Sequence, residues 1–235
     1  MASVYLIPSL LHEEGINSIS AYVTDAIKEC QVFFVESERT TRRYFKQLWK
    51  FFLPEEEIII DSFEWHTINE SSYGLFKQKL KEGKTIGIVS EAGCPGVADP
   101  GQQLIAIAQE MNVAVKPMMG PSSILLALMA SGMNGQQFQF AGYLPIDNAA
   151  RIKAIKELES YSAKKNCTQI FIETPYRNNQ LVDALIKSCN AGTRLCIAVD
   201  ITGKNEWIKT RTIEQWQNDK PDIHKHPAIF LLYAI

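Results

Sequence analysis

Short β-branched runs alternate with amphipathic helical patterns through the first half of this chain, and this alternation restricts its fold more than any other feature. Strands are predicted over residues 4–8, 32–36, 57–61, 84–89 and 113–116, and helices over 17–30, 40–52, 70–81 and 102–111. Strands separated by helices pair in parallel, because each helix carries the chain back to the start of the next strand. The sequence predicts an N-terminal α/β domain, residues 1–117, with a parallel sheet covered by helices on both faces.

The cluster Lys116–Pro121 contains two prolines around a glycine, and it marks the predicted domain boundary. After it, strands are predicted over residues 138–143, 168–173, 195–200, 205–210 and 227–235. Helices are predicted over 122–131, 149–161, 178–189 and 212–218. Two consecutive strands near residue 200 indicate a hairpin, so part of this sheet is antiparallel. Residues 118–235 are therefore predicted to form an α+β domain with a mixed sheet.

The segment Ser90–Gly101 combines glycines and prolines in a loop between a predicted strand and a helix. Asp99 fits the N-cap of that helix, and Pro100 fits its first position. In open parallel sheets, ligands bind beyond the carboxyl ends of the strands, which is where this loop is expected. A tight turn without a ligand fits the local pattern equally well.

Composition narrows the function classes only partly. A net charge of −2 and a pI near 6.1 argue against binding nucleic acid by overall charge, but they leave local basic patches open. The five scattered cysteines predict reduced thiols in a cytoplasmic protein, with no disulfide framework. His224 and His226 alternate in a predicted loop with no cluster of carboxylates nearby in the sequence, so no metal site is predicted. Neither a signal peptide nor a membrane span is expected.

Basic residues gather at the start and along one face of the helix predicted over residues 40–52: Arg39, Arg42, Arg43, Lys46 and Lys50. A solvated helix surface explains them, and so does contact with a polyanion at the carboxyl edge of the sheet. The segment Phe63–His66 is expected on the same edge, in a loop after the third strand.

Several segments resemble the tetrapyrrole methylase superfamily in order and spacing. Ser90–Pro95 with Asp99–Gly101 is similar to its S-D-A-G-T-P-x-x-x-D-P-G signature. Further similar segments are Glu36–Arg39 (E-D-T-R), His66 with Asn69 and Glu70 (H-x-x-N-E), Pro117–Ser123 (P-x-x-G-P-x-A), Phe140–Pro145 (F-x-G-F-L-P) and Phe171–Arg177 (F-Y-E-S-x-H-R). The similarity is greatest to the branch that methylates a cytidine 2′-hydroxyl in small-subunit ribosomal RNA.

This resemblance implies two α/β domains with a cleft between them that binds S-adenosylmethionine, and a homodimer. The implied cofactor-binding residues are Pro8, Ser90, Glu91, Ala92, Gly93, Cys94, Pro95, Pro121, Ser122 and Ser123. A ribose hydroxyl becomes a good nucleophile only when its proton is accepted. By motif position, the acceptor side is expected to contain Glu36, Arg39, His66, Glu70 and Lys204, with His66 or Glu36 as the proton acceptor.

The chain also departs from the family pattern. Pro8–Glu13 stands where the family has P-T-P-I-G-N, Asp147–Arg151 keeps only the arginine of K-x-K-G-R, and Asp200–Lys204 replaces E-L-T-K. Two other functions therefore stay open beside RNA methylation. One is a methylase of a tetrapyrrole precursor or another small molecule, and the other is a protein that binds the cofactor without catalysis.

Overall fold

A computed structural model of the chain describes residues 2–234. Met1 and Ile235, the outer ends of the two predicted domains, lie outside the described residues, as does the end of the strand predicted over 227–235. The chain divides into two compact units, Met1–Ser122 and Ser123–Ile235. The first unit therefore includes residues 118–122, which the sequence analysis assigns to the second domain.

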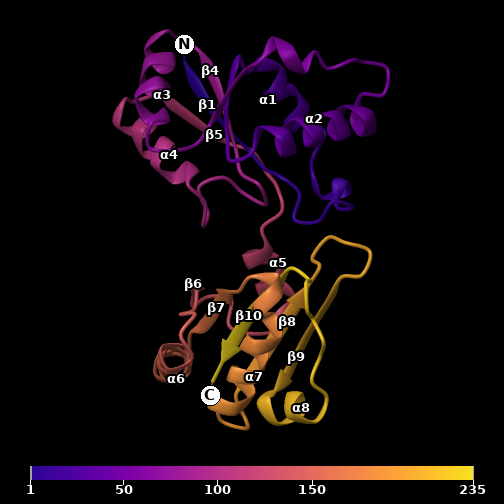
Figure 1. Cartoon of the computed structure of the whole chain (residues 1–235), viewed down its shortest axis with the longest axis vertical. Helices are drawn as coiled ribbons and strands as arrows, with labels where there is room; N and C mark the ends of the chain where they lie inside the picture. Colours follow the sequence, from indigo (N-terminus) through magenta and orange to yellow (C-terminus); the bar gives the residue numbers. More distant parts are fainter. Residues whose placement is uncertain (1, 235) are drawn as a thin grey trace. The chain divides into compact units, whose positions relative to one another are not determined.

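The first unit contains a five-stranded sheet in the order β3-β2-β4-β1-β5 (Figure 1). Every pairing in it is parallel, as predicted. Its strands are β1 (Ser3–Ile7), β2 (Val32–Val35), β3 (Glu64–Thr67), β4 (Thr85–Val89) and β5 (Ala114–Pro117). Buried β-branched and aromatic residues fill β2 and β4, because both strands are covered on two faces.

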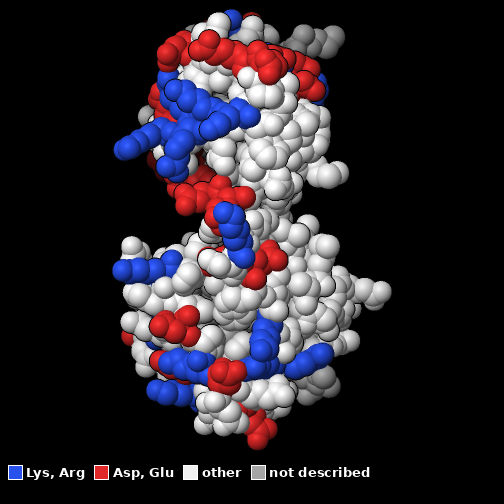
Figure 2. All heavy atoms as spheres, turned by 90° about the vertical axis from the view of Figure 1, so that its right-hand side faces the viewer, with Lys and Arg blue, Asp and Glu red and all other residues white. Residues whose placement is uncertain are grey.

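Helices cover both faces of this sheet. α1 (Val23–Glu29) and α2 (Glu38–Phe52) pack on the core formed by Phe33 and Val35, whereas α3 (Ser72–Lys81) and α4 (Gly101–Glu110) pack on the core formed by Phe34 and Ile88. Adjacent residues of one strand point to opposite faces, so β2 contributes to both cores. Basic side chains gather over the part of this unit that carries α2 (Figure 2).

The strand order creates a topological switch point at β4. The chain leaves β1 toward α1 on one face of the sheet, and it leaves the neighbouring strand β4 toward α4 on the other face. Loops that diverge in this way leave a crevice beyond the carboxyl ends of the two strands, and ligands of open α/β sheets bind in such crevices. The fold therefore indicates a ligand site at the loops after β1 and β4.

The second unit contains a mixed sheet in the order β6-β7-β10-β8-β9, in which only the β6–β7 pair is parallel. Its strands are β6 (Phe138–Tyr143), β7 (Thr168–Ile172), β8 (Arg194–Val199), β9 (Trp207–Thr212) and β10 (Ala228–Tyr233), and its helices are α5 (Ser123–Ser131), α6 (Asn148–Lys165), α7 (Asn178–Ser188) and α8 (Ile213–Asn218). The buried centre lies where α6, α7 and α8 meet the sheet, around Phe171 and Trp216. The predicted mixed sheet is confirmed.

Two predicted elements of the first unit are wrong. The strand predicted over residues 57–61 is absent: the chain forms a 3₁₀ turn at Ile60–Ser62, and the edge strand follows at Glu64–Thr67. The helix predicted over residues 17–30 is reduced to a 3₁₀ turn at Ile16–Ser18 and the seven residues of α1. Ser18 and Thr24 bond through their hydroxyls to backbone carbonyls three residues earlier, which competes with regular helix there. None of the described helices is both long enough and apolar enough to span a bilayer.

Candidate functional site

The loops that follow β1 and β4 are tied together by backbone hydrogen bonds. Ser9 and Gly93 exchange N–H···O bonds of 2.8 and 3.2 Å, and the Ser9 hydroxyl donates to the Ser90 carbonyl at 2.6 Å. Gly93 has a φ of 72°, a conformation that glycine adopts without strain. The predicted Gly-Pro loop is therefore fixed to its neighbour at the switch point.

The segment after β5 reaches the same place. A Cβ added to Gly120 would lie 2.1 Å from the Cβ of Pro8, so only glycine permits this approach. The Cys94 thiol lies 3.7 Å from the carbonyl oxygen of Gly120 and 3.5 Å from that of Pro121. Three of the predicted cofactor-binding segments, represented by Pro8, Cys94 and Pro121, thus meet at one edge of the first unit.

The Asp99 side chain connects the end of the loop to the start of the next helix. Its Oδ1 accepts the N–H groups of Gly96 at 2.9 Å and Gly101 at 2.8 Å. The predicted positions are wrong by one residue, since Pro100 is the N-cap and the helix begins at Gly101. Asp99 precedes the cap, and its side chain still accepts the first N–H group of the helix. Burial raises the pKa of Asp99, while the backbone hydrogen bonds lower it.

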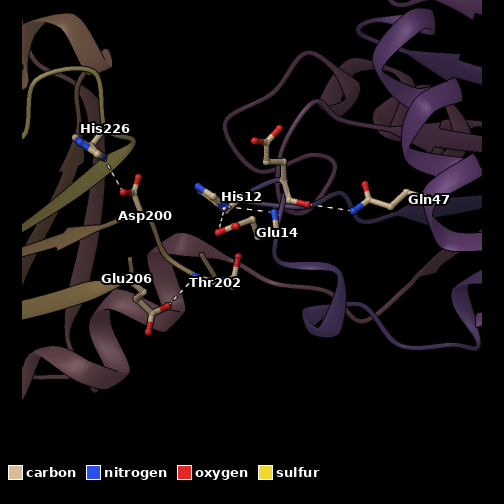
Figure 3. Close-up of polar contacts among 8 residues, drawn as sticks. His12, Glu14, Gln47, Asp200, Thr202, Glu206 and His226 are labelled. Atoms are coloured by element: carbon tan, nitrogen blue, oxygen red, sulfur yellow. Dashed lines mark hydrogen bonds and ion pairs between the residues drawn. The ribbon is translucent and has the colours of Figure 1, made fainter. Parts of the chain in front are cut away.

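A cavity of about 520 Å³ lies beside these loops, between the segment after β1 and the start of α2. It is lined by Ser9, Leu10, Leu11, His12, Glu13, Glu14, Thr40, Thr41, Arg43, Tyr44, Gln47, Ser90, Glu91 and Ala92. Figure 3 shows how its wall is organised: the Gln47 amide donates to the Glu13 carbonyl at 3.1 Å, and the Glu14 N–H donates to Nδ1 of His12 at 3.3 Å. The buried Tyr44 hydroxyl donates to the Pro8 carbonyl at 2.7 Å. This cavity has the size of a small-molecule site.

Glu36 connects the end of β2 to the Gly-Pro loop. Its Oε1 accepts the backbone N–H of Glu91 at 2.9 Å. Burial raises the pKa of the Glu36 carboxyl, and the nearby charges of Asp99 and Glu91 raise it further, against the lowering effect of the Glu91 N–H. Glu36 thus reaches the cavity through Glu91, which lines it. A half-buried carboxyl with a raised pKa is suited to accepting a proton.

Neither Glu36 nor the three other predicted catalytic residues of this unit line the cavity. Arg39 is exposed on the first turn of α2, and Glu70 is exposed before α3. His66 lies inside β3 and not in a loop after the third strand, so that expectation is wrong. Its ring packs 5.1 Å from that of Phe34, and its Nε2 lies 2.8 Å from Oε1 of Glu64.

The remaining predicted residues lie in the Gly-Pro loop, at the end of the first unit or in the second unit. Pro95 is buried in the loop, Ser122 is the last residue of the first unit, and Ser123 begins α5. Lys204 lies between β8 and β9.

The segment before Lys204 is strained. Asp200 and Thr202 have φ values of 49° and 71°, which are costly for residues with a Cβ, above all for a β-branched one. Asp200 bonds to Nδ1 of His226 at 2.7 Å, and the Thr202 N–H donates to Glu206 at 2.7 Å (Figure 3). These contacts hold the strained turn in place.

Sequence reasoning missed most of the cavity wall formed by residues 10–14 and by α2. In the sequence, the segment Pro8–Glu13 stands out only because it departs from the family pattern. Arg43 stands out only as one of several basic residues on a predicted helix. Tyr44 and Gln47 carry no signal, because their roles depend on bonds to backbone carbonyls 36 and 34 residues away. Among residues 2–234, no group of three or more His, Cys, Asp or Glu is placed to hold a metal ion.

Curated proteins similar to this chain share one name. A protein of Micromonospora olivasterospora, "Ribosomal RNA small subunit methyltransferase I", is 35% identical over 74% of this chain and 52% of its own length. A Vibrio cholerae protein of the same name is 28% identical over 98% of this chain and 77% of its own length. The chain spans about half the length of several curated relatives that it matches, from 44% to 54% in four further cases.

Solved structures resemble the fold at low sequence identity. The crystal structure of diphthine synthase aligns with a TM-score of 0.66 and 15% identity, over 100% of this chain and 90% of that one. The methyltransferase CobJ aligns with a TM-score of 0.61 and 15% identity, over 99% of this chain and 93% of that one. A family model matches residues 15–217. The chain belongs to the family of tetrapyrrole (corrin/porphyrin) methylases.

Proposed function

We propose that the first unit binds S-adenosylmethionine at the joined loops after β1 and β4. The observation that carries this proposal is the pair of backbone hydrogen bonds between Ser9 and Gly93. These bonds hold a mainly uncharged loop at the topological switch point, beside a cavity of about 520 Å³. Cavities of this size hold cofactor-sized molecules. Ala92 leaves room for a ligand, and the carboxylates of Glu91 and Glu36 can accept hydrogen bonds from its amine or hydroxyl groups.

The proposed reaction transfers a methyl group to a ribose 2′-hydroxyl in small-subunit ribosomal RNA, a substrate class suggested by the name of the curated relatives. The cofactor supplies a methyl group activated by its bond to a sulfonium. Transfer would break the C–S bond, leave its electron pair on sulfur as a neutral thioether and form the O–C bond, while the hydroxyl proton would pass to a base. The protein therefore needs to align the acceptor with the methyl group, exclude water and accept one proton.

Glu36 is the proposed proton acceptor. Its carboxyl is half-buried, its pKa is raised, and its contact with the Glu91 N–H ties it to the cofactor loop. His66 was the other expected acceptor, but its packing on Phe34 and its bond to Glu64 favour a structural role. Arg39, Glu70 and Lys204 remain proposed contacts of the acceptor RNA.

Two further properties rest on the sequence and not on geometry: the homodimer on the family resemblance, and the cytoplasmic location on the scattered cysteines. The protein is proposed to be a homodimer, which sedimentation velocity measures directly. It is also proposed to act in the cytoplasm, where ribosomal subunits are its substrate.

The test is transfer of radiolabelled methyl from S-adenosylmethionine to small ribosomal subunits from a strain that lacks this protein, followed by nuclease mapping. Ala92→Phe fills the cavity wall and should abolish labelling and cofactor binding. Ala114→Phe is the matched control, since Ala114 is also an exposed alanine of the same unit and does not line the cavity.

Label at a single ribose that is absent with Ala92→Phe would support both parts of the proposal. Cofactor binding by calorimetry without label on subunits would overturn the RNA substrate. It would direct the search to tetrapyrrole precursors and other small acceptors, or to a protein that binds without catalysing. No cofactor binding would overturn the site itself.

A further inference from the structure

Four basic side chains form one stripe along α2: Arg39, Arg43, Lys46 and Lys50. Their spacings of four, three and four residues place them on a single face of the helix. All four are exposed, whereas Tyr44, Phe45, Leu48 and Trp49 bury the opposite face against the sheet. We call these four residues the α2 basic stripe.

The stripe is not neutralised within the chain. Within residues 2–234, none of its four side chains forms an ion pair or hydrogen bond with another residue. Arg42 on the same helix differs, since it pairs with Glu38 at 2.8 Å and Asp61 at 2.6 Å. Like charges three and four residues apart destabilise a helix. A feature that costs stability and has no internal partner points to an external one.

The position of the stripe connects it to the cavity. Arg43 lines the cavity together with Thr40 and Gln47, and Lys46 and Lys50 continue along the helix away from it. At 1.5 Å per residue, the stripe is about 16 Å long. Figure 2 shows basic side chains gathered over this part of the first unit, bordered by acidic ones. The acidic run Glu55–Glu57 follows α2 in the sequence.

We propose that the α2 basic stripe binds consecutive phosphates of the RNA strand that carries the methyl acceptor; this rests on the proposed function of the cavity. A line of evenly spaced, unpaired cations matches the regular phosphates of a nucleic-acid strand, and about 16 Å covers several of them. Such contacts hold the strand in register without reading its bases. The stripe thus accounts for RNA binding by a chain with a net charge of −2.

The test compares two charge reversals with identical chemistry. Lys46→Glu with Lys50→Glu changes the far half of the stripe and leaves the cavity wall intact. Lys77→Glu with Lys81→Glu is the matched control, because these lysines have the same spacing and exposure on α3, which covers the other face of the sheet. Binding to small ribosomal subunits is measured over a range of salt concentrations, and calorimetry measures cofactor affinity.

The stripe variant is expected to bind subunits at least about tenfold more weakly. The slope of log affinity against log salt should fall by about 1.5, since each lost phosphate contact removes roughly 0.7 to 0.9. The α3 variant should match the wild type, and both should bind the cofactor normally. Lys46→Gln with Lys50→Gln removes the same two positive charges without adding negative ones. It should show the same change in slope, and it replaces the Glu variant if that variant does not fold.

Unchanged affinity and slope in both stripe variants would overturn the inference, even if the wild type methylates ribosomal RNA. Other outcomes distinguish the RNA-binding role of the stripe from the proposed methyl transfer. Salt-dependent subunit binding that is lost in the stripe variants would support the stripe even where no methyl transfer occurs. A wild type that does not bind subunits at all would overturn the stripe, while a labelled small acceptor would then still support methyl transfer.

Discussion

At the scale of single residues, Glu36 has two separable tasks: its Oε1 accepts the Glu91 N–H at 2.9 Å, and its carboxyl is the proposed proton acceptor. Glu36→Gln keeps an oxygen at the first task and removes the second. We expect it to bind the cofactor like the wild type but to transfer methyl groups about 10²–10⁴ times more slowly, the usual effect of losing a general base. Calorimetry and single-turnover labelling measure the two quantities.

Glu36→Ala is the companion variant, since it also leaves the Glu91 N–H without its partner. Loss of a hydrogen bond to a charged group costs about 1.5–3 kcal/mol, so cofactor affinity should fall by roughly ten- to a hundredfold. Full methyl transfer by Glu36→Gln would show that Glu36 only positions the loop.

The raised pKa of Glu36 gives a pH dependence of stability. A carboxyl whose pKa is raised by folding contributes stability that is complete below its ordinary pKa of 4.5 and is lost as the pH rises through the folded value. Glu36→Gln removes this titration. The variant should therefore gain stability relative to the wild type as the pH rises from about 4 to 8. Urea midpoints across this range measure the difference, and a difference that stays constant with pH would contradict the argument.

At the scale of elements, the close approach of the segments after β1 and β5 depends on Gly120. A Cβ there would lie 2.1 Å from that of Pro8, so Gly120→Ala forces the two segments apart. We expect a loss of about 1–3 kcal/mol in unfolding free energy, together with weaker cofactor binding. Gly74→Ala is the control. Gly74 lies in α3, and a Cβ added there would meet nothing within 4 Å, so this substitution should raise the unfolding free energy by about 0.5–1 kcal/mol.

Both variants are compared by urea unfolding with equal protein concentrations and with cofactor titrations. A Gly120→Ala protein as stable as Gly74→Ala would mean that the segments separate at no cost. In that case the glycine would not explain how Pro8 and the Gly-Pro loop come together.

The elements also show where sequence patterns are sufficient and where they fail. The run Ile58–Ile60 has strand propensity, but Ile60 is buried against the core in a 3₁₀ turn while Ile59 is 71% exposed. The edge strand forms instead at Glu64–Thr67, where Trp65 stacks 5.1 Å from Phe33 of β2. Register with a neighbouring strand decides the outcome, and that partner lies about thirty residues earlier in the chain.

The candidate site likewise contains one part that the sequence predicts and one part that it does not. Ser90–Ala92 could be predicted because glycine and proline mark a loop locally, and the sheet topology then places that loop at the carboxyl edge. The contribution of Tyr44 and Gln47 could not be predicted, because it depends on backbone carbonyls of the β1 loop that meet α2 only after folding.

At the scale of the whole molecule, each unit closes its own core. The two clusters of the first unit, including the side chains packed against them, use residues between Ala2 and Met118. The cluster of the second unit, counted in the same way, uses residues between Ala141 and Leu232. Both sheets are likewise complete within one unit, as the predicted two-domain organisation requires. A domain with its own core and sheet folds independently as a rule.

The fragment of residues 123–235 is therefore expected to fold alone. It contains all five strands of its sheet, helices α5–α8 and the buried Trp216, whose indole N–H donates to the Leu195 carbonyl at 2.8 Å. Far-ultraviolet circular dichroism and Trp fluorescence should report one coincident, cooperative urea transition. Trp216→Phe should lower its midpoint, since it removes this buried bond and some packing volume. A gradual, probe-dependent transition of the fragment would show instead that the second unit depends on the first for its structure.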